Sequence, residues 1–209
     1  MTSGPEGRTA ERVYSRLAPV YDLLYGAMLQ PGRNRAMARL APQAGDLILE
    51  VGVGTGFGLA GYPADVRIVA VDLSSQMLAR ASKRLSCRGI DHITLCRMDA
   101  AHLAFAESTF DAVYAPYLIN VVPDSVAVAK EMVRVCRPGG RIVLLNHFDR
   151  DLVTDNSVSR AIGRIATRIT SVNWFLDLET FLQNAELTPV SVEDVNIPRV
   201  SSVVLCRKP

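Results

Sequence analysis

The 209-residue sequence lacks the residue clusters that mark several common protein classes. Its four cysteines (Cys87, Cys96, Cys136 and Cys206) form no C-x-x-C pair, and its three histidines lie far apart. We therefore expect neither a metal site nor a disulfide framework. Three of the cysteines fall within apolar runs, which predicts buried, reduced thiols in a cytosolic protein.

The net charge is also small, and long apolar runs are absent from the sequence. The formal net charge is only +2, which is too small to predict a nucleic-acid partner. No apolar run is long enough to cross a bilayer, and the N-terminus has no apolar core of a signal peptide. With 49% hydrophobic and 21% charged residues, we expect one globular domain, 1–209, that is cytoplasmic and monomeric.

Short apolar runs alternate with longer helical segments from Asp46 onward, which predicts a parallel sheet with helices on both faces. Ser74 is a typical N-cap for one of these helices. Two β-rich runs near the end, 188–197 and 201–208, are too close for a crossover helix and should pair antiparallel. The five expected parallel strands are Leu47–Val51, Val66–Val71, Ile93–Cys96, Ala112–Ala115 and Ile142–Leu145.

This α/β pattern divides the domain into four segments. An N-terminal helical cap (1–41) precedes a nucleotide-binding core (46–146), and a helical insertion (147–187) separates the core from the C-terminal hairpin (188–209). Asp111 lies at the amino end of the fourth strand, where a structural role is expected. Pro138-Gly139-Gly140 is interpreted as the turn into the fifth strand.

The first strand ends at Glu50-Val51 and continues into Gly52, Gly54 and Gly56. Glycines at the carboxyl end of such a strand let the backbone approach a ligand. The dinucleotide pattern G-x-G-x-x-G fails from Gly52, because Phe57 occupies its sixth position. A P-loop sequence is also absent. The alternative of a plain tight turn explains one or two glycines, but not three alternating ones behind an acid.

The pattern E-x-G-x-G-x-G, followed by "VAVDLS", "DAAHLAFAESTFDAVYA" and "VCRPGGRIVL", resembles the class I S-adenosylmethionine-dependent methyltransferases. This resemblance covers 46–145 and implies a Rossmann-like fold, with S-adenosylmethionine as cofactor and S-adenosylhomocysteine as product. It implies that the three glycines line the methionine moiety, that Asp72 binds the ribose hydroxyls, and that Met98 and Asp99 contact the adenine. The full implied cofactor set is Glu50, Gly52, Gly54, Gly56, Asp72, Leu73, Met77, Met98, Asp99, Ala100 and Ala115.

The residues themselves leave some of these roles open. Asp99 taken alone is as well explained as a helix N-cap. Methylation of a base amino group would need [DNS]-P-P-[YFW] after the fourth strand, where this chain has Ala115-Pro116-Tyr117. A nucleic-acid substrate is therefore not expected.

Two helical segments carry arginines on one face, which suits the surface of an anionic membrane. A solvated surface face is the alternative explanation of either segment alone. The two triads are Arg8, Arg12 and Arg16 in the first segment, and Arg160, Arg164 and Arg168 in the second.

A second resemblance extends over most of the chain. "YSRLAPVYDLLYGAMLQPGRNRA", "VGVGTGFGL" and "APYLINVVPD" are similar to segments of soluble-type bacterial phosphatidylethanolamine N-methyltransferases. This implies a phospholipid substrate at the inner face of the cell membrane, methylated successively to phosphatidylcholine. Quinone C-methyltransferases share the pattern Y-x-x-x-A-x-x-Y-D, so a lipid quinone is the rival acceptor. A non-catalytic cofactor- or lipid-binding module is the alternative of another class.

Candidate acceptor-site residues follow from the chemistry of an ammonium substrate. Tyrosine rings can hold a cation, although packing explains any one of them equally well. His147, at the carboxyl end of the fifth strand, can accept the ammonium proton or serve a structural role. The tyrosines are Tyr14, Tyr21, Tyr25 and Tyr117, and further candidates are Asn120 and Asn146 for the amine and Arg33 for the phosphate.

Overall fold

The computed structural model describes residues 29–148, 176–196 and 201–209. Both arginine triads, together with Tyr14, Tyr21 and Tyr25, lie outside these ranges. The described residues form one seven-stranded sheet with the order β3-β2-β1-β4-β5-β7-β6. Its strands are β1 (Leu47–Val51), β2 (Arg67–Asp72), β3 (Ile93–Arg97), β4 (Phe110–Pro116), β5 (Cys136–Asn146), β6 (Pro189–Val195) and β7 (Ser201–Arg207).

Strand directions confirm the predicted architecture. Strands β1 to β5 pair in parallel, whereas β7 pairs antiparallel with both β5 and β6. The chain reverses its winding between β1 and β4, because β2 and β3 lie on one side of β1 and β4 on the other. Such a switch point, at the carboxyl ends of parallel strands, is where doubly wound sheets bind ligands.

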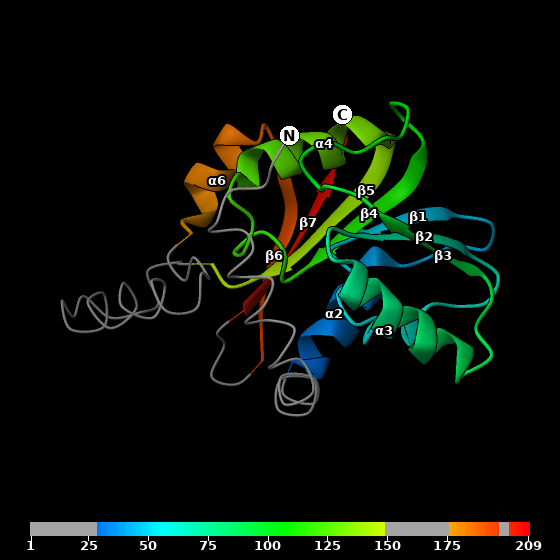
Figure 1. Cartoon of the computed structure of the whole chain (residues 1–209). Coiled ribbons are helices and arrows are strands. Elements are labelled where there is room, and N and C mark those ends of the chain that lie inside the picture. The colour runs from blue at the N-terminus through cyan, green and yellow to red at the C-terminus, as the bar shows by residue number, and fades with distance from the viewer. Residues whose placement is uncertain (1–28, 149–175, 197–200) are drawn as a thin grey trace.

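Helices cover both faces of the sheet, as predicted (Figure 1). Helices α2 (Gln30–Leu40) and α3 (Ser75–Ser86) lie on one face, and α4 (Ser125–Val135) and α6 (Leu178–Asn184) on the other. Ser74 caps α3 by accepting from the Met77 N–H, as its sequence position predicted. All four cysteines are free, and Cys136 and Cys206 are buried.

The fifth strand begins earlier than predicted. Cys136 already pairs with Phe110, so Pro138–Gly140 lies within β5, and the interpretation of this segment as a separate turn is wrong. The pairing of β4 with β5 shifts register here, and the Gly139 N–H donates to the Lys208 carbonyl. Asp111 has the structural role expected of it, because its carboxylate accepts from the Leu47 N–H at 2.7 Å and pairs with Arg137.

The connection from β1 to β2 contains only a short 3-10 helix, η1 (Leu59–Gly61). A parallel crossover usually places a full helix over the sheet at this point. Among the described residues, the β1–β2 connection therefore covers the face between α2 and α3 with a loop and η1, and not with a full helix.

Candidate active site

The glycine turn after β1 has two tight positions and one open position. All three glycines have positive φ, which favours glycine: +76° at Gly52, +56° at Gly54 and +74° at Gly56. A Cβ at Gly52 would lie 2.7 Å from Leu118 Cδ1, and one at Gly56 would lie 2.9 Å from Ala81 Cβ. A Cβ at Gly54 would meet no atom of the described residues within 4 Å. These residues therefore leave room for a ligand above Gly54.

Asp72, the last residue of β2, holds this turn in place. Its carboxylate accepts from the Gly54 N–H at 2.7 Å and from the Ser74 N–H at 2.9 Å. Burial raises the pKa of Asp72, and these two hydrogen bonds offset part of the rise. Each carboxylate oxygen retains a further lone pair, so Asp72 can also accept from a pair of vicinal hydroxyls.

An apolar surface continues from Asp72 along the ends of β2 and β3. Leu73 is 62% exposed, which is unusual for a leucine beside a buried strand. The Met98 N–H donates to the Asp72 carbonyl, and its half-buried side chain lies in the loop after β3. Met77, in the first turn of α3, and Ala100 are also half-buried. These residues fit the flat, apolar faces of a nucleoside.

Asp99 has a partly exposed carboxylate that accepts from the Ala101 N–H at 2.9 Å. A turn and not a helix follows it, so within the described residues Asp99 is not a helix N-cap. Ala115 differs from the other predicted cofactor residues, because its side chain is fully buried in the core on the α4 face. Only its backbone can reach a ligand.

Two asparagines predicted as acceptor contacts instead join the ends of β4 and β5. Asn120 donates to the His147 carbonyl at 2.7 Å and accepts from the His147 N–H at 3.0 Å. Asn146 is fully buried and accepts from the Ile119 N–H at 3.1 Å. Both side chains are buried and position the segment that carries His147.

His147 and Tyr117 belong to a polar network that the sequence did not indicate. His147 Nδ1 lies 3.1 Å from Ser201 Oγ, and Asn196 contacts the same hydroxyl. Asn196 also donates to the Tyr117 hydroxyl and accepts from the Gly32 N–H. The network therefore ties β5, the C-terminal hairpin and the start of α2 to the loop after β4.

Glu50 lies on the α2 face of β1 and is almost completely buried. Its carboxylate accepts from the Tyr62 hydroxyl at 2.7 Å, and it is paired in the sheet with Tyr114 of β4. Burial raises the pKa of Glu50 to about 7, although the Tyr62 hydrogen bond and the positive charge of Arg33 both oppose this shift. Glu50 is thus a carboxyl group that can be neutral or charged near neutral pH.

Sequence reasoning missed Tyr62, Tyr114, Asn196 and Ser201. Tyr114 could have been found, because it lies in the carboxyl half of β4 and is paired with Glu50 of the neighbouring parallel strand β1. Asn196 contacts Gly32 across 164 positions of sequence. Nothing local in the sequence signals that contact.

Together, the glycine turn, the acid ending β2 and the winding reversal beside β1 define a nucleoside-binding site of a doubly wound α/β protein. A family model described as "Methyltransferase domain" matches residues 49–144. The phosphatidylethanolamine N-methyltransferase of Cereibacter sphaeroides is 37% identical over 188 residues, which cover 86% of this chain and 90% of that protein.

A quinone methyltransferase matches a smaller part of the chain. The ubiquinone/menaquinone biosynthesis C-methyltransferase UbiE of Desulfotalea psychrophila is 35% identical over 149 residues, which cover 68% of this chain and 59% of that protein. A solved geranyl diphosphate methyltransferase in complex with SAM shares the fold, with a TM-score of 0.71 and 17% identity over 85% of each chain. The chain belongs to the class I S-adenosylmethionine-dependent methyltransferases, and S-adenosylmethionine is its cofactor.

Proposed function

We propose that this methyltransferase methylates the amine of phosphatidylethanolamine, in successive steps toward phosphatidylcholine. The observation that carries the proposal is the extent of the similarity to the Cereibacter sphaeroides enzyme, which spans nearly the whole of both chains. The similarity to the quinone C-methyltransferase spans little more than half of that protein. A shared cofactor core explains such a partial match, whereas the longer match at 37% identity also includes residues outside that core.

The acceptor chemistry requires a proton acceptor near the methyl donor. When bound, S-adenosylmethionine supplies an electrophilic methyl group on its sulfonium. A phosphatidylethanolamine ammonium has no lone pair until it loses a proton, so each transfer needs a base. We assign this role to His147, because it follows the carboxyl end of β5 and the contact between its Nδ1 and Ser201 orients the ring.

Tyr117 has a more limited role in this proposal than the sequence suggested. The guanidinium carbon of Arg33 lies 5.3 Å from the centre of the Tyr117 ring, so a protein cation already contacts the ring. The ring centres of Tyr117 and His147 are 5.5 Å apart. We infer that Tyr117 supports His147 and that the other predicted tyrosines, outside the described residues, contact the ammonium.

We also propose that the enzyme reaches its substrate as a peripheral membrane protein, through the two arginine triads. Among the described residues, no helix combines the length and apolarity needed to cross a bilayer. Replacing both triads with glutamate should abolish cosedimentation with anionic vesicles. Unchanged sedimentation of the variant would contradict the membrane proposal and leave the acceptor proposal intact.

Incorporation of a labelled methyl group tests the acceptor directly. The full-length protein is incubated with labelled S-adenosylmethionine and vesicles that contain phosphatidylethanolamine and a demethylated quinone. We expect label in mono- and dimethyl-phosphatidylethanolamine and in phosphatidylcholine. Label found solely in the quinone would establish the rival C-methyltransferase function.

Substitution of His147 tests the assigned base. His147→Gln should lower the turnover number at least tenfold and remove the rise of activity with pH, while affinity for S-adenosylhomocysteine stays the same. Equal activity and an unchanged pH profile would show that His147 is structural.

A further inference from the structure

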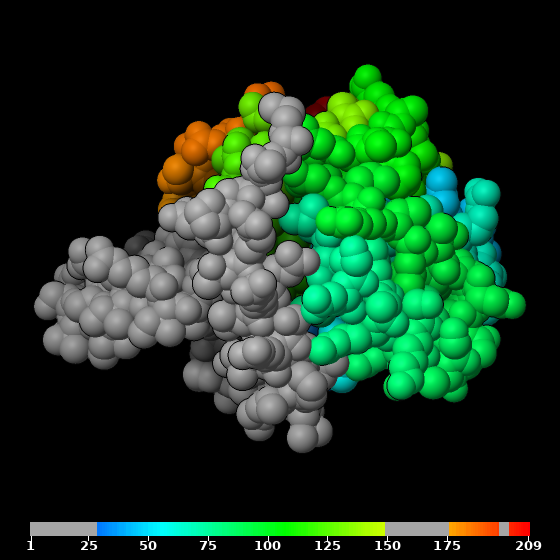
Figure 2. Space-filling model, in the orientation of Figure 1, coloured from blue at the N-terminus to red at the C-terminus, as the bar shows by residue number. Residues whose placement is uncertain are grey.

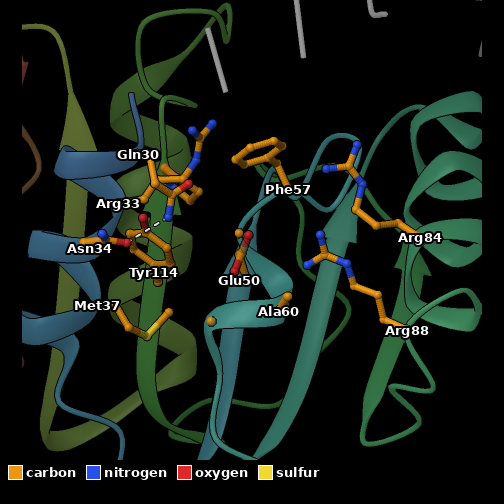
Figure 3. Close-up of a pocket in the computed structure, with 13 residues that line it drawn as sticks. Gln30, Arg33, Asn34, Met37, Glu50, Phe57, Ala60, Arg84, Arg88 and Tyr114 are labelled. Carbon is orange, nitrogen blue, oxygen red and sulfur yellow. Dashed lines mark hydrogen bonds between the residues drawn. The ribbon is translucent and has the colours of Figure 1, made fainter. Parts of the chain in front are cut away.

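A cavity of about 620 Å³ lies on the α2/α3 face of the sheet, where the β1–β2 connection leaves no full helix. Its walls come from α2, β1, β4, η1 and the end of α3 (Figure 3). Phe57 and Gly58, which directly follow the glycine turn, also line it. The cavity therefore adjoins the cofactor turn.

Three arginines surround this cavity. Arg33 and Arg84 lie on opposite sides of Phe57, each with its guanidinium carbon 5.1 Å from the ring centre (Figure 3). Arg88, just after α3, points toward the cavity from the same side as Arg84. Helix α3 lies at the surface of the molecule in the space-filling view (Figure 2). The phenylalanine ring thus holds two positive charges near the opening.

The negative charge available in the cavity is small by comparison. Among the described lining residues, Glu50 is the single acidic side chain. Burial raises its pKa to about 7, so near neutral pH a substantial fraction of the carboxyl is uncharged. Among the described lining residues, the arginines therefore outnumber the single carboxyl group, which favours an anionic ligand.

Two buried donor groups in the cavity have no hydrogen-bond acceptor. Tyr114 is 3% exposed, and its hydroxyl has no partner in the described part of the chain. The same is true of Arg33 Nη1. Buried polar groups without partners are costly, and native structures contain few of them. Both groups can donate to one acceptor placed in the cavity.

We propose that this cavity binds a phosphate group. Arg33 and Tyr114 donate hydrogen bonds to its oxygens from the α2 side, and Arg84 and Arg88 supply positive charge from the α3 side. A phosphate offers several acceptor oxygens around one centre, and guanidinium groups match that geometry. The phosphate is either the phosphodiester of a phospholipid headgroup or free phosphate. The assignment to a phospholipid headgroup rests on the proposed function, whereas the existence of a phosphate site does not.

Binding of two soluble probes to the full-length protein tests the site. Glycerophosphoethanolamine represents the headgroup phosphodiester, inorganic phosphate represents the free anion, and ³¹P NMR titration reports each affinity. We expect saturable binding that weakens at least tenfold in Arg84→Gln/Arg88→Gln. Arg67→Gln, an exposed arginine at the opposite end of the sheet, should bind as the wild type does. Tighter binding of the diester assigns the headgroup, and tighter binding of inorganic phosphate assigns the free anion.

Tyr114→Phe gives a second measurement that is independent of the charge change. It removes the unpartnered hydroxyl and keeps the ring, so thermal stability without ligand should be equal or higher. Probe affinity should still fall severalfold, which a purely structural tyrosine would not cause. If the double arginine variant fails to fold, Arg88→Gln alone should weaken binding about threefold.

Three results would overturn the proposal. The first is that neither probe binds saturably. The second is that the arginine variants bind the probes as tightly as the wild type does. The third is that the arginine variants lose affinity for S-adenosylhomocysteine and keep their affinity for the probes. The last result would show that the arginines hold the cofactor carboxylate. Label in the quinone together with arginine-dependent probe binding would refute the proposed function alone.

Discussion

On the α4/α6 face of the sheet, apolar side chains from β1, β4 and β5 meet those of both helices in one continuous core that includes Met132 and Phe181. On the α2/α3 face, a similar core exists, but the described residues leave a cavity between the helices, with Glu50 in its wall. The first face is closed by two helices, whereas the second is partly covered by a loop. The comparison indicates that the first face mainly stabilises the fold and that the second provides room and charge for ligands.

The largest expected effect is a difference between the two faces in the stability lost when one side chain is truncated. Phe181→Ala removes a ring that is 2% exposed in the closed face and should lower the free energy of unfolding by about 4 kcal/mol. Met37→Ala, in the half-buried wall of the cavity, should cost about 1 kcal/mol or less, because little packing is lost. Urea unfolding of both variants measures the difference, and equal losses would contradict the distinction.

A second prediction concerns the buried carboxyl of the open face. The pKa of Glu50 is about 7 in the folded protein and near 4.5 in the unfolded chain, so between these values the folded state binds more protons. Its stabilising contribution is fully present below pH 4.5 and is lost as the pH rises through 7, by up to about 3 kcal/mol.

Glu50→Gln should remove this dependence, because the amide does not titrate and can still accept from Tyr62. As the pH rises from 4.5 to 8, the unfolding free energy of the wild type should fall relative to that of the variant. Parallel profiles would show that Glu50 has an ordinary pKa.

A third prediction concerns the cofactor edge of the sheet, where the two faces meet. Asp72→Asn should weaken S-adenosylhomocysteine binding by about 2 kcal/mol, or roughly thirtyfold, because it removes a charged acceptor from the ribose site. Asp111→Asn provides the matched control at the amino end of the sheet, where it should lower stability but leave affinity unchanged. Calorimetric titration of both variants checks this, and equal affinities would place the ribose elsewhere.

The smallest expected effect concerns a single methyl group in the glycine turn. Gly54→Ala and Gly45→Ala place alanine at φ values of +56° and +84°, and no atom of the described residues lies within 4 Å of the new Cβ. Each should therefore cost about 1 kcal/mol of stability. Gly54→Ala should also reduce cofactor affinity severalfold, whereas Gly45→Ala, before β1, should not. Equal affinities would show that the space above Gly54 does not receive the cofactor.

Most of the fold could be predicted because its signals are local. Apolar runs between amphipathic segments indicated the strands, and Ser74 marked the start of α3. The same reasoning failed at Pro138–Gly140, since a local turn signal does not reveal that Cys136 already pairs with Phe110. Proline and glycine residues such as these can be assigned to a strand only when the pairing with the neighbouring strand is known.

In the site, Gly52, Gly54, Gly56 and Asp72 could be located from local sequence, because a turn that needs positive φ and an acid at a strand end each involve only a few neighbouring residues. The surroundings of Glu50 and His147 instead depend on contacts between segments that are distant in sequence. Tyr114 reaches Glu50 through strand pairing, and Ser201 reaches His147 through the C-terminal hairpin. The cavity likewise depends on the β1–β2 connection, which places no full helix over the sheet between α2 and α3. Contacts between distant segments depend on strand order and loop length, which no local pattern encodes.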